Sequence, residues 1–227
     1  MSLILSIETS TPLCSVAIHQ SGKLVSTFET QEEGGHGKRL TRLIESACED
    51  AKISLAELDA IAISIGPGSY TGLRIGLATA KGLCFGLDKP LISLSTLKIM
   101  ANAWEGIPEN TLLMPMMDAR RMEVYTAVFD YQTKRELIES AAVILEPNSF
   151  ENLEKETIAF GNGALKWQGV CINPKILFSD EHPYPHARHM GEDAHQAFIM
   201  QKFAELIQAE PEYLKEFMGT KPKLKSV

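Results

Sequence analysis

Two carboxylate residues, Glu8 and Asp118, stand where the sequence could support metal binding or acid–base chemistry. Each ends a short apolar run typical of a buried strand, and each is followed by a tight turn. In that position, with Thr9 and Ser10 beside Glu8, a carboxylate could hold Mg²⁺ next to a nucleotide phosphate. The alternative is structural, because two arginines follow Asp118 closely and an ion pair or turn cap is the commoner role of such a group.

A glycine-rich run, Gly66-Pro67-Gly68-Ser69-Tyr70-Thr71-Gly72, joins an expected buried strand to an expected helix. A turn of this kind exposes backbone N–H groups at the positive end of the helix dipole, where an anion can bind. The run lacks the Gly-Lys-Ser/Thr ending of a P-loop, and Thr71 stands where the third glycine of G-x-G-x-x-G would be. The alternative is a tight turn in which Ser69 or Thr71 caps the helix.

The helix expected over residues 70–86 contains interior glycines that need an explanation. Each costs about 1 kcal/mol relative to alanine, so Gly76 and Gly82 together cost roughly 2 kcal/mol. Close packing against another element must offset this cost. That element is either the chain's own sheet or a helix of another protein. With Leu40, Leu43 and Ile44 on a neighbouring amphipathic helix, the pair could form a docking surface.

Histidines and cysteines offer weaker candidates. The spacing of His182, His186 and His189 could suit zinc, but two prolines between the first two histidines prevent a regular helix, so we expect a surface loop. The four cysteines form no C-x-x-C pair, which argues against a disulfide framework or a cysteine zinc site. We find no Ser/His/Asp order and no activated cysteine, so the sequence predicts no catalytic nucleophile.

The elements that position these residues occur twice along the chain. Three antiparallel strands are expected over 3–30, then a helix from residue 38, a strand over 60–65, the glycine-bearing helix, a strand at 91–93 and a helix from Ser95 to Trp104. The stretch 113–145 repeats the three strands, followed by an expected helix over 147–154 and a strand over 157–160. Such an internal duplication predicts an α/β fold of two similar lobes.

The break at residues 106–110 divides the chain into an N-terminal lobe, 1–106, and a smaller C-terminal lobe, 107–227. Apolar residues spaced from about 190 to 208 indicate a long C-terminal helix that packs back across a lobe.

Composition restricts the function further. The 227 residues include 22 Lys and Arg against 29 Asp and Glu, a net charge of −7, which disfavours nucleic-acid binding by the chain alone. The tail from Lys215 to Lys225 is the basic exception. No apolar run approaches the roughly 18 residues of a membrane span, and the N-terminus has no signal-like pattern, so we expect no membrane partner and a cytoplasmic location.

Several of these segments together resemble the TsaB family, also called YeaZ. The resemblance is carried by Ile4-Leu5-Ser6-Ile7-Glu8-Thr9-Ser10-Thr11, by Gly66 to Gly76 with Ala80-Lys81-Gly82-Leu83, and by Asp118-Ala119-Arg120-Arg121-Glu123-Val124-Tyr125. It is strong over roughly the first 130 residues and weaker afterwards. It implies an actin-like or Hsp70-like fold of two ribonuclease-H-like lobes with the second reduced, in agreement with the duplication.

The resemblance also implies a function. TsaB proteins are non-catalytic partners of TsaD, the transferase that makes threonylcarbamoyladenosine beside the tRNA anticodon, with help from an ATPase called TsaE. TsaB lacks the metal-binding histidine pair of TsaD, and here only His36 precedes the first helix. We therefore expect a scaffold that meets tRNA only through the complex, forms a homodimer when alone, and binds no cofactor by itself, with ATP or ADP restricted to the complex interface.

The family's surface for TsaD binding and self-association, carried over to this sequence, comprises Leu40, Leu43, Ile44, Ala47, Leu73, Gly76, Leu77, Ala80 and Leu83. Glu8 departs from the family, in which many members have Asp at the usual Mg²⁺ position. The competing hypothesis is an actin-fold ATPase or phosphotransferase that uses Glu8, Asp118 and the Gly66–Gly72 loop, with Thr9, Ser10, Gly66 and Gly68 as further nucleotide contacts.

Overall fold

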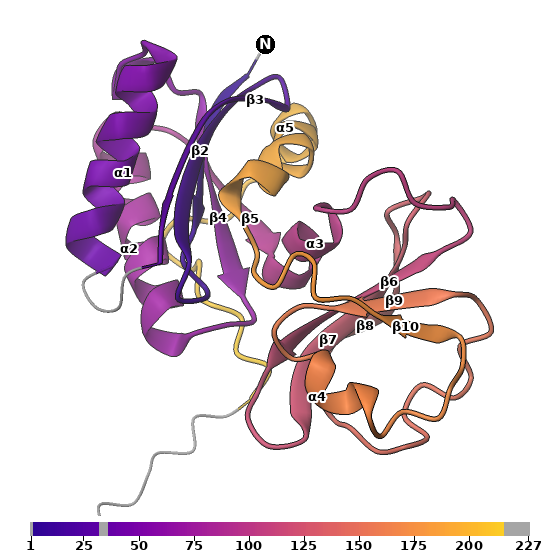
Figure 1. Cartoon of the computed structure of the whole chain (residues 1–227). Coiled ribbons are helices and arrows are strands. Elements are labelled where there is room, and N and C mark those ends of the chain that lie inside the picture. The colour runs from indigo at the N-terminus through magenta and orange to yellow at the C-terminus, as the bar shows by residue number, and fades with distance from the viewer. Residues whose placement is uncertain (1, 32–35, 216–227) are drawn as a thin grey trace, which may run out of the picture.

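The computed structural model describes residues 2–31 and 36–215 and contains two five-stranded sheets (Figure 1). The first sheet has the order β3-β2-β1-β4-β5 and the second the order β10-β9-β6-β7-β8. Their strands are β1 (Leu3–Glu8), β2 (Cys14–Gln20), β3 (Lys23–Thr30), β4 (Ala60–Gly66) and β5 (Leu91–Ser95), and β6 (Leu112–Asp118), β7 (Glu123–Asp130), β8 (Glu136–Ile144), β9 (Thr157–Phe160) and β10 (Ile176–Phe178).

The second sheet repeats the first, with β6 in the place of β1. In each, the first three strands of the chain are antiparallel and the next two continue the sheet in parallel. This is the duplicated ribonuclease-H-like topology of an actin-like fold, so the fold class predicted from the repeat is confirmed.

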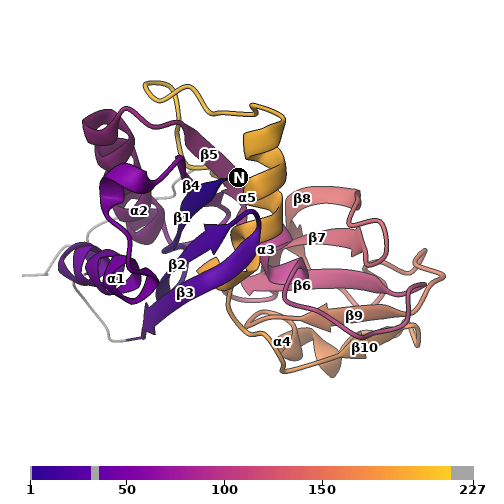
Figure 2. The ribbon, with the colours of Figure 1, turned by 90° about the horizontal axis from the view of Figure 1, so that it is seen from above.

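Helices cover both faces of the first sheet (Figure 2). On one face lie α1 (His36–Ala51) and α2 (Tyr70–Leu87), with the single turn η1 (Leu55–Glu57) between them in the chain. On the other face lie α3 (Thr96–Ala101), η2 (Ala187–Met190) and α5 (Gly191–Ile199). As expected, Ser95 is the N-cap of α3, where its side chain accepts a hydrogen bond from the backbone of Lys98.

The second lobe is reduced in helices. The prediction of a helix over 147–154 is wrong, because this segment forms successive turns. The α-helix beside the second sheet in the described residues 107–186 is the four-residue α4 (Leu165–Gln168), whereas η2 and α5, which follow in the chain, pack on the first sheet. Trp167 of α4 is fully buried between the rings of Phe150 and Phe178. Its indole N–H donates a hydrogen bond to the carbonyl of Glu146 at 2.9 Å.

The C-terminal helix expected over about 190–208 is shorter, because α5 ends at Ile199. Gln201 has a positive φ of 52° and donates its N–H to the carbonyl of Phe198, while Lys202 donates to Ala197. These two bonds are the Schellman arrangement that terminates a helix. Beyond it the chain turns back, and Ala204 donates to Leu91 at the free edge of β5. The helix packs against β1 and β5 of the first lobe.

Two sequence features lie outside the described residues: Gly34-Gly35 before α1, and the basic tail beyond Lys215. Among the described helices, none has the length and apolar character needed to cross a membrane.

Candidate functional site

The turn after β1 buries the first candidate carboxylate. Glu8 is 0 % exposed; its Oε1 accepts the backbone N–H of Ser10 at 2.6 Å, and its Oε2 has no hydrogen-bond partner among the described residues. Burial raises the pKa of Glu8, against a smaller lowering effect of Ser10 and Ser64. Glu8 therefore caps the turn from a fully buried position, and its expected role as a Mg²⁺ ligand stays a prediction.

Asp118 occupies the equivalent place in the second lobe but has a different environment. It is exposed, receives the ammonium of Lys166 from α4, and accepts the backbone N–H of Arg120 at 2.9 Å. Burial tends to raise the pKa of Asp118, but the bonds from Lys166 and Arg120 outweigh that effect and hold it below its usual range. The ion pair expected with a following arginine is formed instead with a lysine 48 residues away.

The glycine-rich run packs directly on the β1–β2 turn. The N–H of Ser69 donates to the carbonyl of Ser10 at 2.7 Å, and a Cβ at Gly68 would lie 2.5 Å from the Cβ of Ser10. Ser69 is the N-cap of α2, since its Oγ accepts the N–H of Gly72 at 3.3 Å. The capping alternative is thus confirmed for Ser69, and Gly68 is required because no side chain fits there.

A cleft of ≈ 1090 Å³ separates the two lobes. Ser10, Gly68 and Tyr70 line it from the first lobe, and Asp118 and Asn162 line it from the second. Of the residues expected to contact a nucleotide, Glu8 and Thr9 are instead fully buried, and Gly66 lies against the carbonyl of Glu212. The described residues contain no group of three His, Cys, Asp or Glu side chains suited to a metal ion.

The surface expected for partner binding faces inward for the most part. Leu40, Ile44, Ala47, Leu73, Gly76, Leu77 and Ala80 are buried in the first lobe, and only Leu43 and Leu83 are partly exposed. The choice of individual residues is therefore corrected, because a side chain in this core cannot reach another protein. The use of the α1 and α2 helices as a docking face remains a prediction.

The outward side of α2 has an unusual composition. Ala78, Gly82, Phe85 and Gly86 are all exposed, and the ring of Phe85 is 83 % exposed. A Cβ at Gly82 or Gly86 would meet nothing within 4 Å. Within the part of the chain that the structure describes, these two glycines and the exposed phenylalanine have no packing role. We call Ala78, Gly82, Phe85 and Gly86 the α2 outer face.

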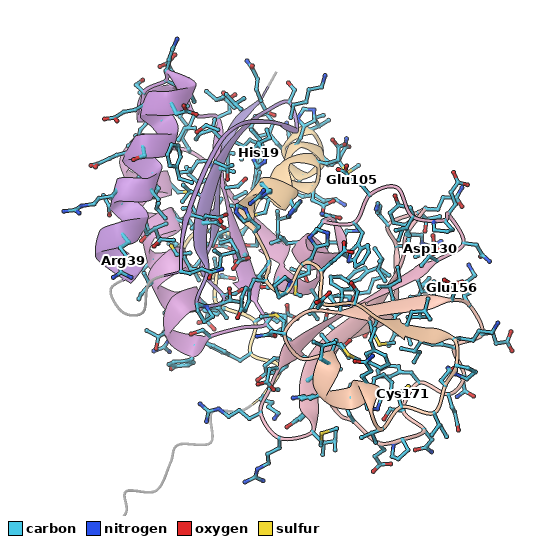
Figure 3. All side chains as sticks on the ribbon, viewed as in Figure 1. His19, Arg39, Glu105, Asp130, Glu156 and Cys171 are labelled. Carbon is cyan, nitrogen blue, oxygen red and sulfur yellow. The ribbon has the colours of Figure 1, made fainter. Side chains whose placement is uncertain are left out.

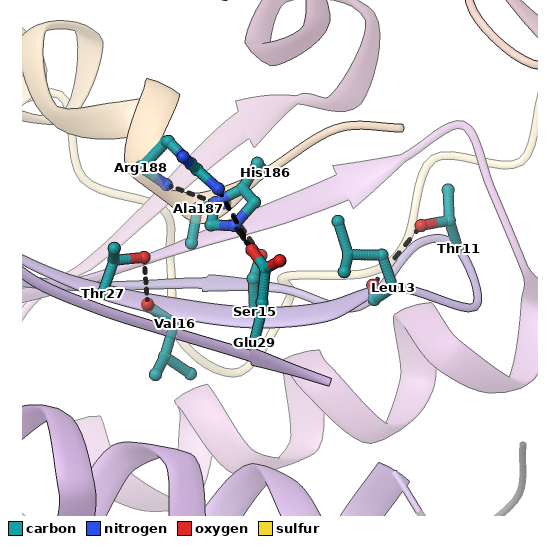
Figure 4. A network of polar contacts seen from close by, with 9 residues as sticks. All are labelled: Thr11, Leu13, Ser15, Val16, Thr27, Glu29, His186, Ala187 and Arg188. Atoms are coloured by element: carbon teal, nitrogen blue, oxygen red, sulfur yellow. Dashed lines mark hydrogen bonds and ion pairs between the residues drawn. The ribbon is translucent and has the colours of Figure 1, made fainter. Parts of the chain in front are cut away.

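A polar network joins the segment before α5 to the first sheet (Figure 4). His186 pairs with Glu29 of β3, Arg188 donates to the same carboxylate at 3.1 Å, and the N–H of Ala187 donates to Ser15 Oγ at 2.9 Å. No local pattern predicts this network, because Glu29 and His186 are 157 residues apart. The histidines expected in a surface loop are therefore partly buried, and they anchor the segment.

His19 is a second buried histidine on the same side (Figure 3). It lies between the first sheet and α5, where its Nδ1 contacts Ser6 Oγ at 3.0 Å and its Nε2 contacts the carbonyl of Arg188 at 3.2 Å. Cys14, Cys48 and Cys84 are free and buried in the first lobe, whereas Cys171 is free and half-buried in the second.

Comparisons with known proteins show which family the chain belongs to. The family model described as TsaD, tRNA N6-adenosine threonylcarbamoyltransferase, matches residues 30–218. The tRNA threonylcarbamoyladenosine biosynthesis protein TsaB of Escherichia coli strain K12 is 33% identical over 227 residues, covering 96% of both chains. The chain belongs to the TsaB family. The TsaB protein of Haemophilus influenzae is 29% identical, covering 93% of both chains.

Solved structures share this fold over most of the chain. YeaZ from Pseudomonas aeruginosa has a TM-score of 0.80 and 26% sequence identity, covering 94% of this chain and 100% of that one. A second crystal structure from the same organism, described as similar to peptidase YEAZ, has a TM-score of 0.81 and 26% identity, covering 95% of this chain and 100% of that one. Both lobes, including the reduced second one, therefore belong to the shared TsaB architecture.

Proposed function

We propose that this TsaB-family chain is a non-catalytic subunit that supports threonylcarbamoyl transfer to tRNA adenosine by a TsaD-like transferase, together with a TsaE-like ATPase. The names of its relatives, which refer to tRNA threonylcarbamoyladenosine biosynthesis, support this pathway. The net charge of −7 supports a role in which the partner makes most of the tRNA contacts.

The observation that carries the proposal is the α2 outer face. Phe85 exposes 83 % of its surface beside Gly82 and Gly86, whose Cβ positions are empty. Large aromatic side chains next to small residues allow close helix packing and are typical of interface hot spots. We infer that a helix of the TsaD-like partner packs here, and that a second copy of the chain occupies the same face when the partner is absent.

The two carboxylates support a non-catalytic role. Glu8 is fully buried and does not line the cleft, and the carboxylate of Asp118 is paired with Lys166, so neither group is placed as a free ligand for Mg²⁺ in the cleft. We propose no cofactor for the isolated protein. ATP or ADP would bind at the interface with the partner, in a cytoplasmic complex.

A reconstitution tests the proposal. Unmodified tRNA, threonylcarbamoyl adenylate, a TsaD-like protein and a TsaE-like protein are combined with and without this chain. The proposal expects modification only when the chain is present, and no modification by the chain alone. Modification at an equal rate without the chain would contradict the scaffold role.

The ATPase alternative gives a different result in calorimetry. Micromolar binding of Mg²⁺-ATP to the isolated chain, lost in Glu8→Ala, would favour an actin-fold ATPase or phosphotransferase. The scaffold proposal expects no such binding, because the buried Glu8 does not face the cleft.

A further inference from the structure

The segment after α5 crosses the cleft between the lobes. After its bridge to β5 it runs along the side of α2, where the ammonium of Lys81 donates to the carbonyls of Ile207 at 3.1 Å and Ala209 at 3.2 Å. The last described residues, 209–215, then run over the glycine-rich turn towards the second lobe. We call residues 209–215 the strap.

The strap backbone lies directly on the glycine-rich turn. The N–H of Glu212 donates to the carbonyl of Ile65 at 2.7 Å, beside the irregular pairing of β4 and β5. A Cβ at Gly66 would lie only 2.5 Å from the carbonyl oxygen of Glu212, and Gly66 has a φ of +132°. Only glycine combines this backbone conformation with such a close approach, so the start of the turn is shaped to receive the strap.

One aromatic side chain of the strap occupies the first-lobe wall of the cleft. The ring of Tyr213 stacks on Tyr70 with centroids 5.1 Å apart, and its hydroxyl accepts a bond from Arg74 Nε at 3.2 Å. The guanidinium of Arg74 also lies 4.2 Å from the centroid of the Tyr70 ring. Tyr213 remains 43 % exposed, so this contact can open without uncovering a core.

The last described residue of the strap reaches the opposite lobe. The ammonium of Lys215 pairs with the carboxylate of Glu123 in β7. Tyr213 and Lys215 both line the interlobe cleft, together with Ser69 of the glycine-rich turn and Arg120 of the second lobe. The strap is therefore bonded to both walls of the cleft that it lines.

The two side-chain contacts at the end of the strap, Tyr213 with Arg74 and Lys215 with Glu123, are solvent-exposed. Exposed ion pairs and exposed aromatic contacts contribute little individually, and segments held only by such contacts open while the rest of the protein stays folded. In contrast, the docking of α5 is held by buried residues such as Met190 and Ala194. The chain thus changes, between α5 and the strap, from a firmly packed element to a weakly held one.

We propose that the strap is a reversible latch that fixes the opening of the interlobe cleft. When it is closed, it joins β4 to β7 and covers the glycine-rich turn. When it is released, the two lobes separate further and the ring of Tyr70 loses the stacked ring of Tyr213. The proposal does not depend on the function proposed above, because it concerns the cleft and not the α2 outer face.

The test measures the distance between the lobes. Spin labels are placed at Glu49→Cys in α1 and Glu139→Cys in β8, both exposed positions, in a Cys171→Ser background. The remaining three cysteines are buried. The combined Tyr213→Ala and Lys215→Glu variant should give a broader interlobe distance distribution that extends to longer distances. The control Lys175→Glu, a charge reversal at an exposed residue of the second lobe, should leave the distribution unchanged.

Hydrogen exchange gives a second measurement on the unlabelled protein. The Glu212 amide should exchange about tenfold faster in the Lys215→Glu variant, while amides in the middle of α2 keep their protection. Joining Lys215→Cys to Glu123→Cys with a short bismaleimide, again with Cys171→Ser, should slow that amide instead. Unchanged distances in the double variant, or exchange at Glu212 that responds to neither change, would overturn the latch.

Discussion

The hydroxyl of Thr9 donates a hydrogen bond to the backbone carbonyl of Gly72 at 2.9 Å, which joins the β1–β2 turn to the first turn of α2. This contact explains two of the helix glycines. A Cβ at Gly72 would lie 2.1 Å from the carbonyl oxygen of Thr9, and a Cβ at Gly76 would lie 2.1 Å from the Thr9 hydroxyl. The inner glycines of α2 thus serve the chain's own packing, and Gly82 and Gly86 need another explanation.

The two classes of glycine should respond oppositely to alanine. Gly76→Ala should lower the free energy of unfolding by about 1–3 kcal/mol, because the new methyl group overlaps Thr9 and lies 3.0 Å from Ile63 Cδ1. Gly82→Ala should raise it by roughly 0.5–1 kcal/mol, because the methyl group enters open space and alanine favours the helix. Urea unfolding of both variants checks this. Equal effects at the two positions would contradict the assignment of the glycines to inner and outer faces.

Glu8→Gln should remove one contribution to the pH dependence of the free energy of unfolding. Because burial raises the folded-state pKa of Glu8 above its ordinary value of 4.5, the folded protein binds more protons than the unfolded chain. The stability contributed by Glu8 is complete below 4.5 and is lost as the pH rises towards the folded-state pKa. The glutamine variant should therefore gain stability relative to wild type as the pH increases, by at most about 1.4 kcal/mol per pH unit. Unfolding curves at a series of pH values measure the difference, and a constant difference between pH 4.5 and 8 would mean that Glu8 is ionised in the fold.

His189 should make the fold sensitive to acid. Burial first, then the charges of His186, Arg188, His182 and His19, lower the pKa of His189 to about 4. The unfolded chain then binds more protons than the folded one between about 6.5 and 4, so stability falls as the pH decreases through that range. His189→Gln should lose less stability than wild type between pH 7 and pH 5. Parallel losses in both proteins would contradict the lowered pKa.

How much of this could be predicted from the sequence depends on the range of the interactions. The strand–turn–strand repeat around Glu8 and Asp118 is local, so the duplicated sheets could be read directly. The orientation of α2 could not be predicted, because small residues lie on both sides of the helix. A hydrophobic periodicity does not distinguish the buried Gly76 from the exposed Gly82. Contacts between distant segments gave no local signal, and the pairs formed by Glu29 with His186 and by Asp118 with Lys166 are of this kind.

In the second lobe, a local sequence pattern predicted a helix that does not form. The helical pattern over 147–154 is real but short, and a helix of so few residues forms only when packing supports it. Here the large ring of Trp167 occupies that side of the sheet, and turns from Pro147 to Leu153 surround it. In this reduced lobe the neighbours of Asp118 are Asn162, which accepts the Asp118 backbone N–H at 2.9 Å, and Lys166 of α4, which pairs with its carboxylate.

We propose that the α2 outer face binds the TsaD-like transferase subunit. Calorimetric titration of the TsaD-like partner with Phe85→Glu tests it most directly, with Ile172→Glu, another exposed apolar residue at 66 % exposure in the second lobe, as the matched control. Because Phe85 has no packing role in the chain, the variant should fold normally and lose about 2 kcal/mol of binding free energy, roughly thirtyfold in Kd. Ile172→Glu should bind like the wild type. Wild-type affinity of Phe85→Glu, or an equal loss of affinity in Ile172→Glu, would contradict the binding of the TsaD-like partner to the α2 outer face.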